Sequence, residues 1–148
     1  MRWGYTVSAL CSAPPAAVWD VLLDGRRWSF WNPGVEWLWL EGKAEPGTLA
    51  TIKFKRVRQT ALVIEEALSP QRFALALTVG PVARMRLTWT LAPQGAGTHI
   101  EAAVAVGGVA AGLLLKRPAK RIAQALAGHL ERLAARACEQ NEKNARLQ

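Results

Sequence analysis

The sequence has 148 residues, of which 51% are hydrophobic, and a formal net charge of +8 at pH 7. This length predicts one domain, residues 1–148, with a core that needs no disulfide or metal, and the apolar content excludes a disordered chain. The two cysteines, Cys11 and Cys138, lie near opposite ends without metal-ligand spacing, so we expect reduced thiols in a cytosolic protein.

The positive charge is concentrated in the middle of the chain. Residues 46–130 contain eleven Lys and Arg against three acidic residues, whereas the flanks hold eight of each and cancel. Such a field attracts anionic ligands, lipid headgroups or nucleic acid. However, no nucleic-acid-binding motif is present, and basic residues on a solvated sheet face explain the excess more simply. We therefore expect no nucleic-acid partner, while contact with a membrane surface stays open.

Neither a signal peptide nor a transmembrane segment is predicted. The N-terminus runs from Met1-Arg2 directly into alternating strand residues rather than into a continuous apolar run. The uncharged apolar segment 102–115 is too short to span a bilayer and contains three glycines. These features predict a cytoplasmic protein.

A strand and two short helices are predicted at the N-terminus. Alternation over residues 3–12 gives a first strand whose core face carries Trp3, Tyr5, Val7, Ala9 and Cys11. Residues 13–47 then hold five of the seven tryptophans. Pro14-Pro15 predicts the start of a helix whose apolar residues recur at helical spacing. A second short helical turn is expected over residues 26–30. After the breaker Asn32-Pro33-Gly34, a strand is expected over residues 35–40.

From residue 48 to residue 106 the pattern predicts antiparallel strands, each with one apolar and one polar face. The expected strands cover residues 48–58, 60–68, 73–79, 84–91 and 98–106, with a turn over 92–97. The expected inward-facing residues are Ala50, Ile52, Phe54, Phe73, Leu75, Leu77, Met85, Leu87, Trp89 and Leu91.

The last third of the chain is predicted to be helical. Its apolar stripe recurs at spacings of three and four and consists of Ile122, Leu126, Leu130, Leu133 and Ala137. Pro118 fits a first turn, but four basic residues would then crowd a helix N-terminus, whose partial positive charge disfavours each by a few tenths of a kcal/mol. We therefore expect a helix that begins near Val109 and bends at Pro118. The whole pattern predicts an α+β fold, with a curved antiparallel sheet of about seven strands around the C-terminal helix.

The order of these signals resembles a known family. The segments "AP", "VWDVLLD", "WSFWNPGV", "PGT" and "VIEEALSPQRFAL", followed by one long C-terminal helix, are similar to the START-like, helix-grip SRPBCC proteins. Within them the sequence most resembles the bacterial polyketide cyclase/dehydrase and lipid-transport group, over nearly the whole chain. The resemblance implies an apolar cavity between sheet and helix, but one fold hosts many functions.

No catalytic constellation is evident, and no catalytic residue is assigned. The sequence lacks metal-ligand spacing, a nucleophile elbow and a phosphate-binding loop, so we expect neither metal nor cofactor. His129 falls on the sheet-facing side of the helix, where it is either a satisfied core histidine or a ligand-contacting group. Arg56 shares a strand face with Phe54 and would meet an acidic ligand group or form a rim ion pair with Glu65 or Glu66. The predicted cavity residues are Tyr5, Ile52, Phe54, Arg56, Leu75, Leu77, Met85, Leu87, Trp89, Ile122, Leu126 and His129.

Trp37 and Trp39 leave two arrangements open. If Leu38 and Leu40 belong to the core, the two tryptophans face outward, against the short helices or a partner chain such as a second copy in a homodimer. In the opposite register they line the cavity. Trp28 and Trp31 are expected to anchor the corner between helix and strand, with Asn32 shaping the turn.

Three functions remain in competition. The first is binding or transport of a small hydrophobic or amphipathic ligand, a lipid, polyketide or aromatic, because the inward-facing groups are mostly apolar. The second is a polyketide cyclase, aromatase or dehydratase, which requires acid/base groups in the pocket, and these are few in the sequence. The third is a quinone-handling or protein-interaction module that uses the basic middle and the outward tryptophans.

Overall fold

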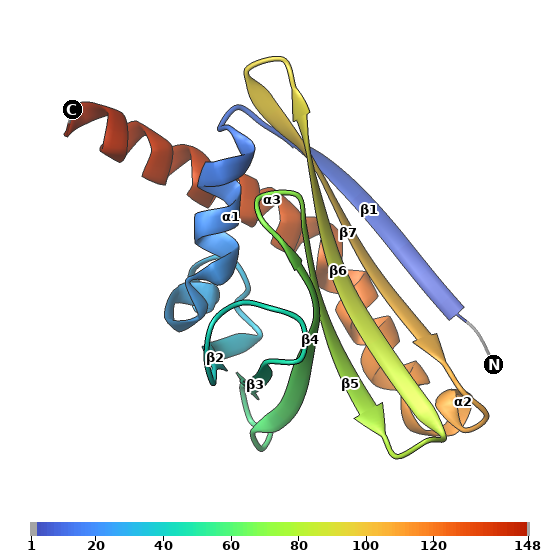
Figure 1. Ribbon diagram of the computed structural model, residues 1–148. Coiled ribbons are helices and arrows are strands. Elements are labelled where there is room, and N and C mark those ends of the chain that lie inside the picture. Colours follow the sequence, from blue (N-terminus) through green and yellow to red (C-terminus); the bar gives the residue numbers. More distant parts are fainter. Residues whose placement is uncertain (1–2, 148) are drawn as a thin grey trace.

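The computed structural model describes residues 3–147 and consists of one antiparallel sheet, one long helix and three short helical segments (Figure 1). The strands are β1 (Trp3–Cys11), β2 (Val35–Leu40), β3 (Leu49–Phe54), β4 (Thr60–Leu68), β5 (Arg72–Val79), β6 (Ala83–Gln94) and β7 (Gly97–Gly107). The helices are α1 (Pro15–Leu23), the 3₁₀ segment η1 (Gly25–Phe30), α2 (Ala111–Leu114) and α3 (Lys116–Arg146).

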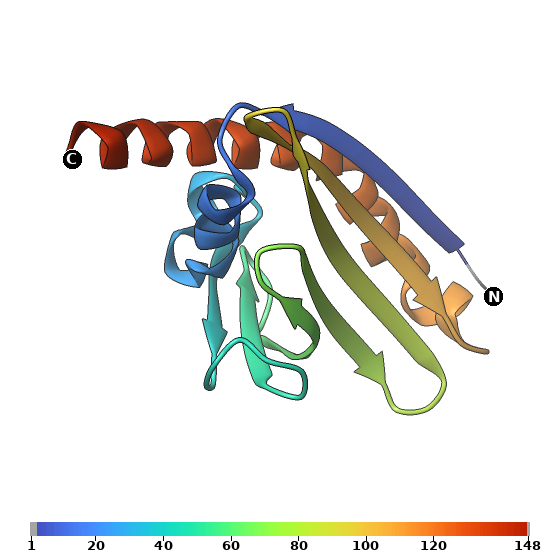
Figure 2. The same cartoon turned by 45° about the horizontal axis from the view of Figure 1, so that its top comes forward.

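All seven strands form one sheet in the order β1-β7-β6-β5-β4-β3-β2, and every neighbouring pair is antiparallel. The sheet curls around α3, while α1 packs on α3 and η1 packs on β2 (Figure 2). This arrangement confirms the predicted α+β fold with a curved sheet, a long C-terminal helix and two short helices between the first two strands.

The alternation of apolar and polar residues sets the strand faces as predicted. Met85, Trp89 and Leu91 of β6 are buried, and the same face of the sheet carries the buried Ile52 and Phe73. Arg84 and Arg86 lie on the opposite face because successive side chains of a strand point to opposite sides.

Two strand ends differ from the prediction by more than one residue, those of β3 and β6. β3 ends at Phe54, four residues early, because the chain turns there and Arg56 adopts a left-handed backbone conformation with φ 64°. The predicted turn over residues 92–97 shrinks to two residues, since β6 and β7 stay paired to Gln94 and Gly97. Gly95, with φ 61°, supplies the left-handed conformation that a two-residue hairpin requires.

The C-terminal helix buries the predicted stripe, but its break is displaced. Leu126, Leu130, Leu133 and Ala137 are buried, and Ile122 packs against the same core. The helix is interrupted at Leu115, between α2 and α3, rather than at Pro118. Proline lacks an amide donor and its ring clashes with the carbonyl four residues earlier, here that of Leu114, so α2 ends at that residue.

Candidate ligand-binding site

A cavity of about 320 Å³ lies between the concave face of the sheet and α3. Ile52 and Phe54 of β3 and Leu87 and Trp89 of β6 contribute its sheet side, and α3 covers it. A second void of about 20 Å³ shares four lining residues with this cavity, so the two adjoin. The complete lining of the larger cavity is Trp28, Trp31, Asn32, Gly34, Val35, Ile52, Phe54, Leu87, Trp89, Arg121, Ile122, Ala125, Leu126 and His129.

The structure brings ten of the twelve predicted site residues to these two spaces. Three of the ten line only the small void: Leu75, Leu77 and Met85. The other seven line the larger cavity: Ile52, Phe54, Leu87, Trp89, Ile122, Leu126 and His129.

Tyr5 and Arg56 lie elsewhere, contrary to the prediction. Tyr5 shares the alternation of Val7 and Cys11, yet it is 44% exposed on an edge strand of the sheet and lines neither space. Arg56 is exposed in the turn after β3, so it does not point inward beside Phe54 as a continued strand would require.

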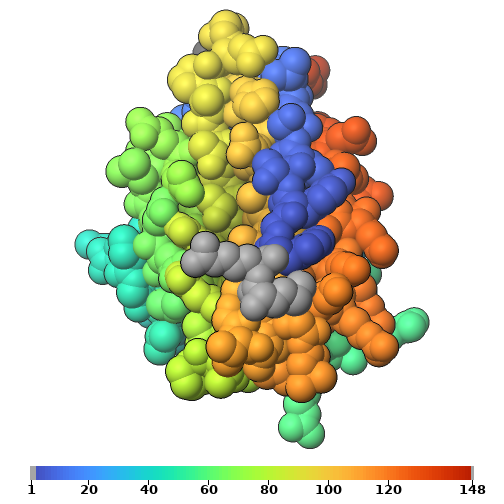
Figure 3. All heavy atoms as spheres, turned by 90° about the vertical axis from the view of Figure 1, so that its right-hand side faces the viewer, coloured from blue at the N-terminus to red at the C-terminus, as the bar shows by residue number. Residues whose placement is uncertain are grey.

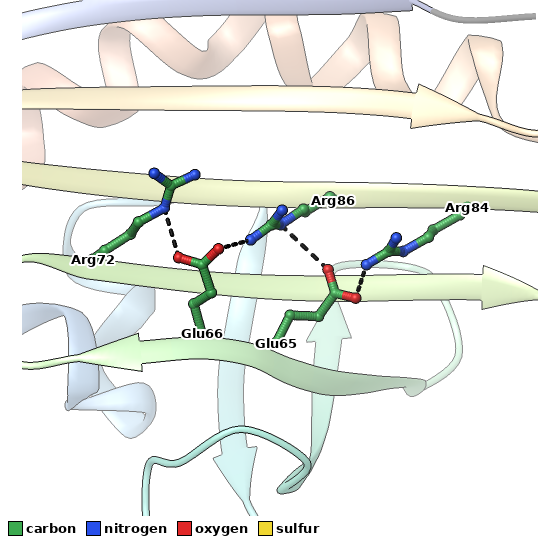
Figure 4. Close-up of polar contacts among 5 residues, drawn as sticks. All are labelled: Glu65, Glu66, Arg72, Arg84 and Arg86. Carbon is green, nitrogen blue, oxygen red and sulfur yellow. Dashed lines mark hydrogen bonds and ion pairs between the residues drawn. The ribbon is translucent and has the colours of Figure 1, made fainter.

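Glu65 and Glu66, the proposed partners of Arg56, pair with other arginines on the convex face of the sheet (Figure 4). Glu66 binds Arg72, with 2.7 Å between Arg72 Nε and Glu66 Oε2, and also binds Arg86. Glu65 binds Arg84 as well as Arg86, whose Nε lies 3.2 Å from Glu65 Oε1. The irregular register between Ile64 and Glu66 lets both consecutive glutamates reach this face.

Four aromatic rings pack together beside the cavity. Trp28, Trp31 and Trp89 line it, and Trp28 contacts both of the others, with centroid separations of 4.9 Å to Trp31 and 5.5 Å to Trp89. Phe73 stacks on Trp89 from the sheet side, at 6.1 Å. Trp28 is further fixed by its indole N–H, which donates to the Leu22 carbonyl at 2.8 Å. The predicted anchoring tryptophans therefore also form part of the cavity wall.

Two polar atoms of the wall are buried without a hydrogen-bond partner among residues 3–147. These are the indole N–H of Trp31, a donor, and Oδ1 of Asn32, an acceptor. A buried polar group without a partner costs about 1–3 kcal/mol, which a bound polar group can recover. Sequence reasoning missed this pair, because both residues belong to the turn at 31–34, and only the curl of the sheet places that turn beside α3.

His129 and Arg121 add ionisable groups on the helix side of the cavity. Burial, with a smaller contribution from the Arg132 guanidinium, lowers the pKa of His129 below its ordinary value of 6.5. The imidazole is therefore neutral at pH 7 and can accept a hydrogen bond or a proton. Arg121 is exposed, so it marks the side on which the cavity meets solvent.

Trp37 and Trp39 do not line the cavity. In β2 the buried residues are Val35 and Leu38. They lie three positions apart because the pairing of β2 with β3 shifts register between Val35 and Trp37. Trp39 is 46% exposed, and the Arg26 guanidinium lies over its ring, 5.4 Å from the centroid. The outward arrangement is therefore correct and the cavity alternative is wrong.

A larger hollow of about 770 Å³ lies at the ends of β1, β5, β6 and β7. Glycine and alanine backbone forms much of its lining, and its two arginines, Arg84 and Arg86, already pair with Glu65 and Glu66. Residues of α2 and α3 are not among its lining residues, so this hollow encloses a ligand less than the smaller cavity does. Within residues 3–147, no group of His, Cys, Asp and Glu is arranged to hold a metal ion, and no helix is long and apolar enough to cross a membrane.

Comparison with known proteins adds a family match and structural neighbours. A family model described as "Polyketide cyclase / dehydrase and lipid transport" matches residues 2–137. None of the curated proteins compared with the chain matches it.

Three solved structures illustrate the fold. The di-domain ARO/CYC StfQ of the steffimycin biosynthetic pathway is 13% identical with a TM-score of 0.71, over 98% of this chain and 52% of its own. Norcoclaurine synthase from Thalictrum flavum, in complex with dopamine and hydroxybenzaldehyde, is 13% identical with a TM-score of 0.69, over 94% and 88%. A Thermus thermophilus protein is 19% identical with a TM-score of 0.68, over 93% and 99%. At such identities the likeness shows the fold alone.

Proposed function

The chain belongs to the polyketide cyclase/dehydrase and lipid-transport family, and on this premise we propose that it binds a small hydrophobic or amphipathic molecule between its sheet and α3. The observation that carries the proposal is the 320 Å³ cavity, whose wall is mainly aliphatic and aromatic. Ligand cavities in proteins typically combine such walls with a small number of polar groups that fix orientation.

The polar atoms of the wall narrow the ligand class. Each buried methylene of a ligand contributes about 0.8 kcal/mol, so the apolar wall supplies most of the affinity. The Trp31 N–H can donate to a carbonyl or hydroxyl oxygen, and Asn32 Oδ1 can accept from a hydroxyl. A lipid, polyketide or aromatic with one or two oxygen substituents satisfies both atoms, whereas a pure hydrocarbon leaves them unpaired.

A large side chain inside the cavity should weaken ligand binding. Ala125 lines the cavity, while Ala127, two residues later on α3, is exposed. We expect Ala125→Phe to weaken binding of the fluorescent probe anilinonaphthalene sulfonate at least about tenfold, a loss of roughly 1.4 kcal/mol. Ala127→Phe should bind as the unmodified chain does. Equal probe affinity in both variants, measured by fluorescence titration and supported by native mass spectrometry of co-purified ligand, would place binding outside this cavity.

A second candidate function is catalysis on the bound molecule, as a polyketide cyclase, aromatase or dehydratase. The specific observation in its favour is that neutral His129 shares the cavity wall with the Trp31 N–H and Asn32 Oδ1. An imidazole base and a hydrogen-bond donor are the groups that proton abstraction next to a carbonyl requires. A carrier releases its ligand unchanged, whereas an enzyme returns a product whose formation His129→Gln slows.

We also propose that the end of the molecule formed by α2 and the start of α3 contacts a lipid surface. Val109 and Leu113 are each 87% exposed, and Leu114 is also exposed. Four basic residues follow, Lys116, Arg117, Lys120 and Arg121, and no acidic residue occurs between Glu101 and Glu131. This segment forms the lower edge of the face seen in Figure 3, beneath β1. Apolar side chains beside cations match an anionic bilayer, where each Lys or Arg near the surface contributes about 1 kcal/mol.

Vesicle sedimentation tests this contact. We expect the chain to bind phosphatidylcholine vesicles that contain phosphatidylglycerol, to bind pure phosphatidylcholine poorly, and to dissociate as salt is raised. Leu113→Asp should reduce binding at least about tenfold, because a charged side chain opposes insertion. Leu147→Asp is the matched control, since Leu147 is 85% exposed at the far end of α3. Equal loss in both variants, or no preference for the anionic lipid, would contradict the proposal.

A further inference from the structure

Cys11 and Cys138 meet in the folded chain although 127 residues separate them. Their Sγ atoms lie 3.5 Å apart, and both are free thiols. Cys11 is the last residue of β1 and is buried, whereas Cys138 lies on α3 and is partly exposed. The sequence predicted reduced thiols, and both are free, but no sequence pattern predicted that the two thiols meet.

The surroundings of the two sulfurs differ, which gives them different reactivity. Ser12 Oγ lies 3.1 Å from Cys138 Sγ, on the exposed side of the pair. Burial opposes ionisation of Cys138, yet its hydrogen bonds, first that with Ser12 and then that with Cys11, outweigh burial and lower the pKa of Cys138. Burial raises the pKa of Cys11 to about 11. Cys138 is thus the more accessible and more nucleophilic sulfur, and Cys11 stays protonated at neutral pH.

We propose that Cys11 and Cys138 form a modification site, a dithiol that hydrogen peroxide oxidises to an intramolecular disulfide. The Cys138 thiolate attacks one peroxide oxygen, so an S–O bond forms, the O–O bond breaks and the second oxygen leaves as water after taking a proton. The Cys11 sulfur then attacks the Cys138 sulfur, an S–S bond forms, and the sulfenic hydroxyl leaves as water with the Cys11 proton. The two thiols lose two electrons and two protons, and hydrogen peroxide takes them up and becomes two waters.

The geometry makes the second step intramolecular and short. A disulfide has an S–S distance of about 2.05 Å, so the sulfurs must approach by roughly 1.5 Å from their present 3.5 Å. Cys11 Sγ also lies 3.4 Å from the Ala134 carbonyl oxygen, one turn before Cys138, which confirms that the end of β1 rests directly on α3. The bond would fasten β1 to the helix that covers the cavity, whatever ligand the cavity takes.

Intact-mass spectrometry of the full chain tests the site. After reduction and removal of the reductant, stoichiometric hydrogen peroxide should yield a monomer lighter by two hydrogen atoms, with the peptides containing Cys11 and Cys138 joined. The disulfide should raise the midpoint of thermal unfolding by about 5 °C or more, because it closes a long loop. Dithiothreitol should reverse both changes.

Two single variants separate the roles of the sulfurs. Cys11→Ser should stop at the Cys138 sulfenic acid, which a cyclic 1,3-diketone traps, whereas Cys138→Ser should leave Cys11 largely unmodified. Both serine variants are close in volume to the parent residue, and their circular dichroism reports whether they fold. Retention of two titratable thiols after peroxide treatment, or disulfide-linked dimers in place of the lighter monomer, would overturn the proposal.

Discussion

Replacing Trp28 by alanine is expected to lower the free energy of unfolding by about 3–5 kcal/mol, the range for a fully buried tryptophan. Trp28 is 1% exposed, packs on Trp31 and Trp89, and donates its indole N–H to the Leu22 carbonyl at 2.8 Å. Removal of the Trp28 side chain enlarges the cavity and deletes the aromatic contacts. It also leaves the Leu22 carbonyl, near the end of α1, without the indole N–H that donates to it. Urea unfolding followed by circular dichroism measures the loss.

Trp39→Ala is the matched control for this substitution. Trp39 lies on the outer side of β2, is 46% exposed, and has the Arg26 guanidinium over its ring. An exposed cation–π contact of this kind contributes about 0.5–1 kcal/mol. Comparable losses of stability in the two variants would mean that Trp28 does not organise the core. Trp28→Phe should fall between them, because it keeps an aromatic ring but loses the hydrogen bond to Leu22 and part of the buried volume.

The fold could be predicted because its information is local and repeated. The strand predicted over residues 60–68 has the observed bounds of β4, and the stripe from Leu126 to Ala137 predicted the buried face of α3. Alternation predicts which face of the sheet a side chain lies on within a strand, but it does not predict the residue at which the strand ends. Arg56 was misplaced for that reason, since the turn after Phe54 is a property of the backbone that no side-chain pattern encodes.

The sequence predicted a cavity residue only where that residue also belongs to the inward-facing pattern of a strand or helix. Ile52, Leu87 and His129 followed from strand and helix period together with the family's expected cavity. Trp31 and Asn32 did not, because they lie in a turn whose position depends on the packing of η1 against β2. The contact between Cys11 and Cys138 could not be predicted either, because two residues that are 127 positions apart in the sequence leave no periodic signal.

Alanine at position 25 is expected to destabilise the chain by about 3 kcal/mol, at the upper end of overpacking effects, and to lower the unfolding midpoint by roughly 10 °C. Gly25 begins η1 at the point where the chain leaves α1 and crosses β2. A Cβ added there would lie 2.1 Å from the Leu38 carbonyl oxygen, which is a backbone atom of a central residue of β2. Neither segment can move without disturbing the tryptophans that follow Gly25.

Substitutions at two other glycines distinguish the effect of this clash from the effect of backbone strain. Gly47 has φ 93° and open space around it, so Gly47→Ala should cost about 1–2 kcal/mol from the left-handed conformation alone. Gly42 needs no unusual conformation, and its added Cβ would meet only Thr48 Cγ2 at 3.9 Å, so Gly42→Ala should stay within about 0.5 kcal/mol of the parent. Thermal and urea unfolding should therefore rank the losses as Gly25, Gly47 and Gly42. If Gly25→Ala proved no worse than Gly47→Ala, β2 and η1 would not be in the close contact that places Trp28 and Trp31 at the cavity.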